Sequence, residues 1–410
     1  MTENSKFPEF PEFPEISKFP EIYPLRTSDY RTLDVKQIFG VCPRAEASLH
    51  AGHAAAVILA GGMGSRLGRT LPKGMCAVSP VKEKSLFQLH FEKIYQLRQR
   101  YDASIPIYIM VNRASIPMVR EFLEKHDFWG VPFEDVFLFV QNELPAVNED
   151  GSLFYDSRGN RCFGPDGHGG LISALESSGA YADMETRGVR TLCTFHIDNP
   201  LVPVLNEAML GMHWETKSEM TSVVVEKFDG MELVGNIVRD SDGHFCVVEY
   251  MDFPMELANL TTPSGTLRFW AGSVGIHLIQ LDFLIDFYRN LVENPALLPF
   301  HHPKKKIITQ DGPVFIRKPE RFLFDILPRT KNPLIVKMDR AEIFTTLKKS
   351  TEIVRDHLNN LYKNWLQKSG AVFSPNASVE IAASFAMDQS TCMAKITPGT
   401  TFSGHTIYLD

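Results

Sequence analysis

The chain has 410 residues, of which 44% are hydrophobic and 22% are charged, a composition typical of a globular protein large enough for two domains. Its formal net charge is −7 and no basic block dominates, which argues against a nucleic-acid-binding protein. No uninterrupted apolar run approaches the length of a membrane-spanning helix, so we expect no membrane association.

The six cysteines are spread along the chain without a C-x-x-C pair. With no signal peptide in the sequence, this spacing predicts reduced thiols in a cytoplasmic protein rather than a disulfide framework or a zinc site. For the quaternary structure we expect a monomer or a weak homo-oligomer.

Residues 1–33 form a low-complexity N-terminal arm in which Phe-Pro-Glu recurs. Prolines at a period of three favour polyproline II, a helix without internal hydrogen bonds. The arm is therefore predicted to be disordered, with docking of its phenylalanines on a partner as the alternative.

Residues 34–331 are predicted to form one catalytic domain in which strands and helices alternate. Apolar runs predict strands at 54–59, 105–111, 136–140 and 191–197, and helical spacing predicts helices at 85–100, 116–126 and 169–182. This alternation is typical of an α/β fold with a doubly wound, mixed but mostly parallel sheet.

Short strands then follow at 223–227, 234–239 and 245–250, separated by turn residues, which predicts antiparallel additions to the sheet. A helix is expected at 281–290. Residues 332–410 are predicted to form a small α+β domain with a helix at 350–368 and short strands after 372.

A glycine-rich loop follows the first strand of the domain, in the order Leu59-Ala60-Gly61-Gly62-Met63-Gly64-Ser65-Arg66, with Pro72-Lys73 close behind. Neither the Walker A pattern nor the dinucleotide fingerprint fits this spacing. Glycines let the backbone turn its N–H groups toward phosphate oxygens, and the two cations can neutralise a polyphosphate. The loop therefore predicts a nucleotide site, the alternative being a glycine-rich turn with incidental basic residues.

Asp198 ends the apolar strand 191–197, which would place its carboxylate at the same sheet edge as the glycine-rich loop. Magnesium usually takes one or two protein carboxylates and completes its shell with substrate phosphates and water. Asp198 is therefore the candidate ligand of Mg²⁺, and a turn-capping aspartate before Pro200 is the alternative.

The ordered segments 59–73, 139–146, 165–171, 196–199, 247–250 and 320–326 together resemble the eukaryotic-type UDP-N-acetylglucosamine pyrophosphorylases, within the wider family that includes UDP-glucose pyrophosphorylase. The resemblance covers roughly residues 55 to 350. It implies a nucleotidyltransferase that joins UTP and a hexose 1-phosphate with the help of Mg²⁺, releasing pyrophosphate.

The resemblance also implies roles for individual residues. It assigns nucleotide binding to Leu59, Ala60, Gly61, Gly62, Gly64, Gln141, Gly167 and His168; sugar binding to Gly235, Glu249 and Ser273; metal binding to Asp198; and catalysis to Arg66, Lys73, Lys318 and Lys348.

The sugar stays open between glucose and N-acetylglucosamine. Where Trp270, Ser273 and Gly275 stand, the acetylglucosamine enzymes of the family carry asparagines, and His168 stands in a Gly-His-Gly string like that of the glucose enzymes. The overall similarity favours N-acetylglucosamine, whereas these positions favour glucose.

Two other functions are compatible with the sequence. One is a UDP-sugar sensor that binds without catalysis, and the other is a glycosyltransferase that holds its metal with Asp240 and Asp242 in a D-x-D string. Gly243 follows at once, so a hairpin turn is the favoured interpretation of that string. The basic segment 301–306 is predicted to be a solvated bend.

Overall fold

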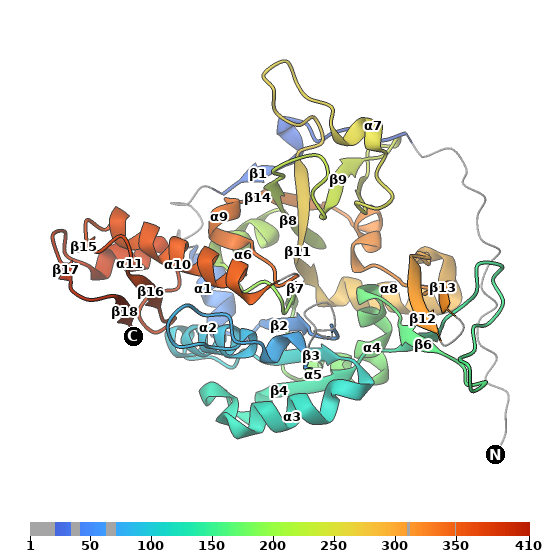
Figure 1. Ribbon diagram of the computed structural model, residues 1–410, viewed down its shortest axis with the longest axis horizontal. Coiled ribbons are helices and arrows are strands. Elements are labelled where there is room, and N and C mark those ends of the chain that lie inside the picture. The colour runs from blue at the N-terminus through green and yellow to red at the C-terminus, as the bar shows by residue number, and fades with distance from the viewer. Residues whose placement is uncertain (1–20, 34–41, 63–70, 310–311, 349) are drawn as a thin grey trace.

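A computed structural model describes residues 21–33, 42–62, 71–309, 312–348 and 350–410 of the chain (Figure 1). Across this described part, none of the helices combines the length and apolar character that a membrane crossing requires.

The centre of the molecule is a ten-stranded mixed sheet. Eight strands lie side by side in the order β1 (Arg31–Thr32), β14 (Leu334–Lys337), β8 (Met220–Glu226), β11 (Ala271–Gln280), β7 (Thr191–His196), β2 (Ala54–Leu59), β3 (Ile107–Val111) and β4 (Val136–Val140). Strand β11 is antiparallel to both of its neighbours, β7 and β8, while the other pairs along this path are parallel. The prediction of a mixed, mostly parallel sheet is therefore confirmed.

Both faces of the sheet are covered, which explains why its central strand β2 is apolar throughout. All six residues of β2 are buried; Ala56 and Ile58 belong to one core cluster, and Val57 and Leu59 belong to the other. The first cluster packs under α1 (Pro43–His50), α2 (Leu86–Tyr101), α3 (Ile116–Lys125) and α10 (Thr351–Lys368). The second packs under α4 (Leu171–Ser177), α5 (Ala180–Thr186) and α8 (Leu281–Glu293). Successive residues of β2 thus point into opposite core clusters, as expected of a strand that is buried on both faces.

A hairpin of β9 (Gly235–Arg239) and β10 (Phe245–Val248) is attached to the sheet through antiparallel pairing of β9 with β11. The predicted antiparallel additions are thus present at 234–239 and 245–250. The strand expected at 223–227 is instead an integral strand of the sheet, β8.

Two local predictions were wrong, and one strand of the sheet was not predicted. The helix expected at 169–182 is divided into α4 and α5, because Gly179 between them has φ +78°. Strand β11 was not anticipated, and the segment 301–306 is not a solvated bend, since β12 (Lys304–Thr309) pairs with β13 (Gly312–Arg317).

Residues 351–410, which we term the C-terminal module, lie beside α1 and α2, on the side of the sheet that these helices cover (Figure 1). The module contains α10, α11 (Gln389–Lys395) and two parallel strand pairs: β15 (Val372–Phe373) with β17 (Thr401–Phe402), and β16 (Ser378–Ile381) with β18 (Thr406–Leu409). The division into an arm, a catalytic domain and a C-terminal domain stays a prediction. The central sheet, however, takes strands from both sides of the expected boundaries, because β1 lies before residue 34 and β14 after residue 331.

Candidate active site

The loops that follow β2 and β7 meet at the carboxyl edge of the sheet. The two strands are parallel neighbours, and Leu59 at the end of β2 pairs with His196 at the end of β7. Ala60, Gly61 and Gly62 therefore leave the sheet beside Asp198. The edge where parallel strands end is where open α/β sheets bind ligands.

Lys73 and Asp198 form an ion pair at this edge, with Nζ and Oδ2 2.7 Å apart. The backbone N–H of Lys73 donates to the carbonyl oxygen of Gly62 at 3.3 Å, which holds the lysine against the glycine-rich loop. The side chains of Lys73 and Asp198 keep 18% and 16% of their surface exposed, so both remain accessible to a ligand. The prediction that Asp198 lies at the same sheet edge as the glycine-rich loop is confirmed for the described part of the loop, residues 59–62.

Lys348 belongs to the same cluster of charges. The N–H of Leu347 donates to the carbonyl oxygen of Asp198 at 2.9 Å, and Lys348 Nζ donates to the carbonyl oxygen of Leu233 at 2.8 Å. Burial lowers the pKa of Lys348, an effect that the nearby Asp198 and Glu249 carboxylates oppose. Asp198 is thus ion-paired with Lys73 and lies within electrostatic influence of Lys348.

The carboxyl group of Asp198 is held in its ionised form. Burial alone would raise its pKa, but the charges of Lys73 and His196 outweigh burial and leave the pKa below its usual value. An ionised aspartate that is accessible to solvent is a suitable magnesium ligand. The donor chemistry of the site therefore fits the expected metal.

Gln141 and Gly61 are in contact at the nucleotide side of the edge. Gln141 Nε2 donates to the carbonyl oxygen of Gly167 at 2.7 Å and to Asp166 Oδ1 at 3.3 Å. A Cβ atom on Gly61 would overlap Gln141 Oε1, so a side chain there would displace the end of Gln141. Gly167 has φ +81° and no room for a Cβ against the Arg321 backbone, which makes it an obligatory glycine.

His168 is fixed by an aromatic stack and a backbone hydrogen bond. Its Nδ1 accepts a hydrogen bond from the N–H of Leu323 at 3.0 Å, and its ring stacks on Phe322 with the centroids 5.2 Å apart. The edge of its ring meets His196 at a centroid distance of 5.3 Å. Burial holds the pKa of His168 well below its usual value, so the ring is neutral and carries its proton on Nε2.

The three residues assigned to the sugar also come together. Gly235 pairs with Ser273 between β9 and β11, and a Cβ on Gly235 would lie 3.4 Å from Glu249 Oε1. Burial raises the pKa of Glu249, as does Asp252, while His301 and Lys348 oppose the shift. A half-buried carboxylate in this position can accept hydrogen bonds from sugar hydroxyl groups.

The remaining predicted residues are placed less directly. Gly64 and Arg66 lie outside the described residues. Lys318 follows β13 and packs against Gly164, where a Cβ would lie 3.3 Å from Lys318 Nζ. Its catalytic role stays a prediction, as do the roles assigned to the other site residues.

Two groups near the site were missed from the sequence. Asp166 lies beside Gln141, and its burial raises the pKa of its carboxyl to about 7. His301 Nε2 pairs with Asp325 Oδ2 at 2.8 Å and stacks on Phe322 at 4.2 Å between centroids. Asp166 could have been found as a titratable residue within the segment 165–171, but nothing in the spacing pairs residues 301 and 325.

The D-x-D string lies in the turn between β9 and β10. The ligand atoms of Asp240, Asp242 and His244 lie within 4.8 Å of one another, close enough to hold a metal ion. Asp240 Oδ1, however, already accepts from the N–H groups of Asp242 at 3.0 Å and His244 at 2.8 Å, the pattern of a self-capped turn. Asp242 and His244 are exposed. This geometry favours the hairpin-turn interpretation.

Comparison with known proteins gives a consistent set of relatives. A family model described as UTP–glucose-1-phosphate uridylyltransferase matches residues 18–388. The probable UDP-N-acetylglucosamine pyrophosphorylase of Schizosaccharomyces pombe is 32% identical over 79% of this chain and 74% of that protein. The UDP-N-acetylhexosamine pyrophosphorylase-like protein 1 of Xenopus tropicalis is 33% identical over 74% of this chain, and the chain spans 61% of its length.

Solved structures agree with these sequence matches. A putative UDP-N-acetylglucosamine pyrophosphorylase from Entamoeba histolytica superposes with a TM-score of 0.81 at 25% identity, over 95% of this chain and 100% of that one. A UDP-glucose phosphorylase from Trypanosoma brucei shares the fold with a TM-score of 0.67 at 15% identity, over 90% of this chain and 78% of that one.

Proposed function

Since the chain belongs to the UTP–glucose-1-phosphate uridylyltransferase family, we propose that it transfers the uridylyl group of UTP to a hexose 1-phosphate, forming a UDP-sugar and pyrophosphate. The observation that carries the proposal is the Lys73–Asp198 ion pair beside the glycine-rich loop. It supplies a cation and a metal-binding carboxylate at the point where a triphosphate would lie.

The reaction needs little from the protein besides orientation and charge neutralisation. An oxygen of the sugar phosphate attacks the α-phosphorus of UTP; the bond to the bridging oxygen of the β-phosphate breaks, and pyrophosphate leaves with that electron pair. The attacking oxygen is already anionic, so no general base is required. Lys73 and Lys348 would neutralise the sugar phosphate and the α-phosphate of UTP. Arg66 and Lys318 would neutralise the departing pyrophosphate.

Asp198 would hold the magnesium ion, because it is the ionised carboxylate that lies beside Lys73. When bound, magnesium supplies additional charge neutralisation on the triphosphate. The protein then has to keep Asp198 ionised, which the Lys73 ammonium does, and to keep the carboxylate accessible.

For the uracil base we propose Gln141 and the 166–170 turn. The Nε2 of Gln141 is engaged by Gly167 and Asp166, and these contacts fix the orientation of the amide. With both N–H groups of the amide engaged, its Oε1 is left as an acceptor for a donor on the pyrimidine edge.

The sugar would lie over Gly235, Glu249 and Ser273. The names of the sequence relatives favour N-acetylglucosamine 1-phosphate, whereas Ser273 in place of an asparagine favours glucose 1-phosphate. We therefore propose a hexose 1-phosphate of one of these two types.

The test is pyrophosphate release from UTP with glucose 1-phosphate and N-acetylglucosamine 1-phosphate in parallel. We expect turnover with at least one sugar, and a loss of about a hundredfold or more in Lys73→Ala, the size seen when a single electrostatic donor is removed. Lys125→Ala, which changes an exposed lysine on α3, is the matched control. UTP binding without pyrophosphate release for either sugar would favour the sensor and overturn the proposal.

A further inference from the structure

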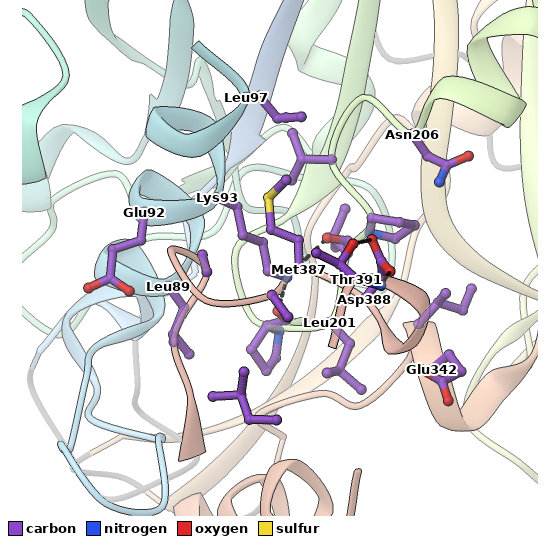
Figure 2. Close-up of a pocket in the computed structure, with 18 of the residues that line it drawn as sticks. Leu89, Glu92, Lys93, Leu97, Leu201, Asn206, Glu342, Met387, Asp388 and Thr391 are labelled. Atoms are coloured by element: carbon purple, nitrogen blue, oxygen red, sulfur yellow. Dashed lines mark hydrogen bonds between the residues drawn. The ribbon is translucent and has the colours of Figure 1, made fainter. Parts of the chain in front are cut away.

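A cavity outside the candidate active site lies between α2, residues 200–207 and the C-terminal module (Figure 2). Its volume is about 380 Å³, within the range of about 300–1,000 Å³ that is typical of small-molecule sites. The walls come from α2, from residues 200–207, from α9 (Arg340–Ile343), from α10 and from residues 381–394. Apolar residues dominate them, among them Leu89, Leu97, Leu201, Ile343, Trp365 and Met387.

Lys93 brings a positive charge into this apolar cavity from α2 (Figure 2). Its Nζ donates to two neutral acceptors, the carbonyl oxygens of Pro200 at 2.6 Å and Val202 at 3.1 Å. Among the described residues, no carboxylate lies within ion-pair distance of Lys93, and burial lowers the pKa of its ammonium to about 7. A buried charge without a counter-ion is costly, so an anion entering the cavity would be stabilised there.

The other charged side chains that line the cavity are already engaged. Glu92 pairs with Lys84 at 2.7 Å, and Glu207 pairs with Arg100 at 3.3 Å. Asp388 caps α11, accepting from the N–H of Thr391 at 2.7 Å.

Glu342 is 8% exposed, and its Oε2 accepts from Trp365 Nε1 at 2.9 Å. Burial raises the pKa of Glu342, which lessens its negative charge, and it enters from α9, away from Lys93 in the view of Figure 2. Lys93 is therefore the charged group of the lining that a ligand could complement.

The cavity walls continue directly into the candidate active site. Pro200 and Val202, which hold Lys93, follow Asp198 by two and four residues. The buried Asn199 ties the two walls together, because its Nδ2 donates to the carbonyl oxygen of Ile343 at 2.9 Å and its Oδ1 accepts from the N–H of Thr345 at 3.3 Å. A ligand whose anionic group pairs with Lys93 Nζ would replace its hydrogen bonds to the carbonyl oxygens of Pro200 and Val202, in the segment that follows Asp198.

We propose that this cavity is a regulatory site for a small organic anion with an apolar body, whose carboxylate pairs with Lys93. Occupation of the site alters UTP binding through residues 199–202; this coupling rests on the proposed function, whereas binding of the anion does not. The apolar walls select the body of the ligand, and the single unpaired cation selects its head group.

Isothermal titration of the full chain with octanoate and with the uncharged 1-octanol tests the site. We expect octanoate to bind the wild type, to bind Lys93→Met at least tenfold more weakly, and to bind Lys93→Arg within about threefold of the wild type. The affinity for 1-octanol should be the same in all three proteins. Equal affinity of octanoate for the wild type and Lys93→Met, or no binding to the wild type, would overturn the proposal.

A second variant locates the probe independently of Lys93. Ala386 is buried in the cavity wall, and Ala386→Leu adds volume there. Its thermal unfolding shows whether the variant is folded. If the folded variant binds neither octanoate nor 1-octanol, that result supports the site. Undiminished binding of octanoate to that variant would place the probe elsewhere and overturn the proposal.

The coupling is read from UTP titrations with and without saturating octanoate. A change of at least threefold in UTP affinity in the wild type, absent in Lys93→Met, supports it, and an unchanged affinity overturns it. Lys93-dependent octanoate binding in a protein that releases no pyrophosphate would refute the proposed function while leaving the anion site intact.

Discussion

The contact between Gly61 and Gln141 gives a sharp prediction, because the neighbouring glycine supplies its control. An alanine Cβ at Gly61 would overlap Gln141 Oε1, while a Cβ at Gly62 would lie 3.8 Å from Lys73 Cδ, an ordinary contact. Neither glycine has a positive φ, so the backbone tolerates alanine at both. The two substitutions therefore differ mainly in what they do to Gln141.

Gly61→Ala forces the Gln141 side chain away and breaks its hydrogen bond to the carbonyl oxygen of Gly167. A net hydrogen bond contributes about 0.5–1.5 kcal/mol, and a buried polar group left unpaired costs about 1–3 kcal/mol. We expect Gly61→Ala to lower the free energy of unfolding by about 1–3 kcal/mol, and Gly62→Ala to stay within about 0.5 kcal/mol of the wild type.

Urea denaturation followed by tryptophan fluorescence measures these differences, and titration with UTP measures the effect on the nucleotide. If Gln141 reads the base, Gly61→Ala should weaken UTP about tenfold or more, which corresponds to about 1.4 kcal/mol. The double variant Gly61→Ala/Gln141→Ala should be no less stable than Gln141→Ala alone, since the overlap is then removed. Equal stabilities of Gly61→Ala and Gly62→Ala would refute the reasoning.

Three further predictions follow from the charges. The pKa of the Asp166 carboxyl is about 7 in the folded protein, above its value in the unfolded chain, so its contribution to stability is full at low pH and is lost as the pH rises through 7. The free energy of unfolding of Asp166→Asn relative to that of the wild type should therefore rise by about 2–3 kcal/mol between pH 5 and pH 8. Urea denaturation at the two pH values measures this, and a constant difference would contradict it. Asp198→Asn should lower magnesium-dependent turnover by about a hundredfold or more, whereas Asp240→Asn should leave it within about twofold of the wild type. The assay is pyrophosphate release as a function of magnesium concentration. A larger loss of turnover in Asp240→Asn than in Asp198→Asn would assign the metal to the hairpin turn. Glu380→Ala should speed proteolytic cleavage of the 81–82 turn, because the buried carboxylate accepts from both N–H groups at 2.8 and 2.7 Å, and unchanged cleavage kinetics would show that these bonds do not hold the turn.

The sequence predicts the part of the site that depends on strand ends. Apolar runs identify β2 and β7, and parallel strands deliver their loops to one edge, so the approach of Lys73 to Asp198 could be expected. Strand β11 was not predicted because glycines interrupt its apolar run. Its pairing with β8 is also irregular, with a shift of register between Ser273 and His277.

Contacts between distant segments carry no local signal. The pairing of His301 with Asp325 depends on how the hairpin β12–β13 returns the chain to Phe322, and residue spacing does not encode that path. The cavity beside Lys93 likewise exists only because the C-terminal module packs against α2. Such features require the tertiary structure.

The central proposal is that the loop after β2 binds a triphosphate whose metal is held by Asp198. A crystal structure with UTP and Mn²⁺ in place of Mg²⁺ tests it most directly, because manganese is located by its anomalous scattering. We predict the anomalous peak between the Asp198 carboxylate and the triphosphate, with the phosphates over Gly61 and Gly62. A peak at the Asp240 turn, or UTP bound away from Lys73, would contradict the proposal.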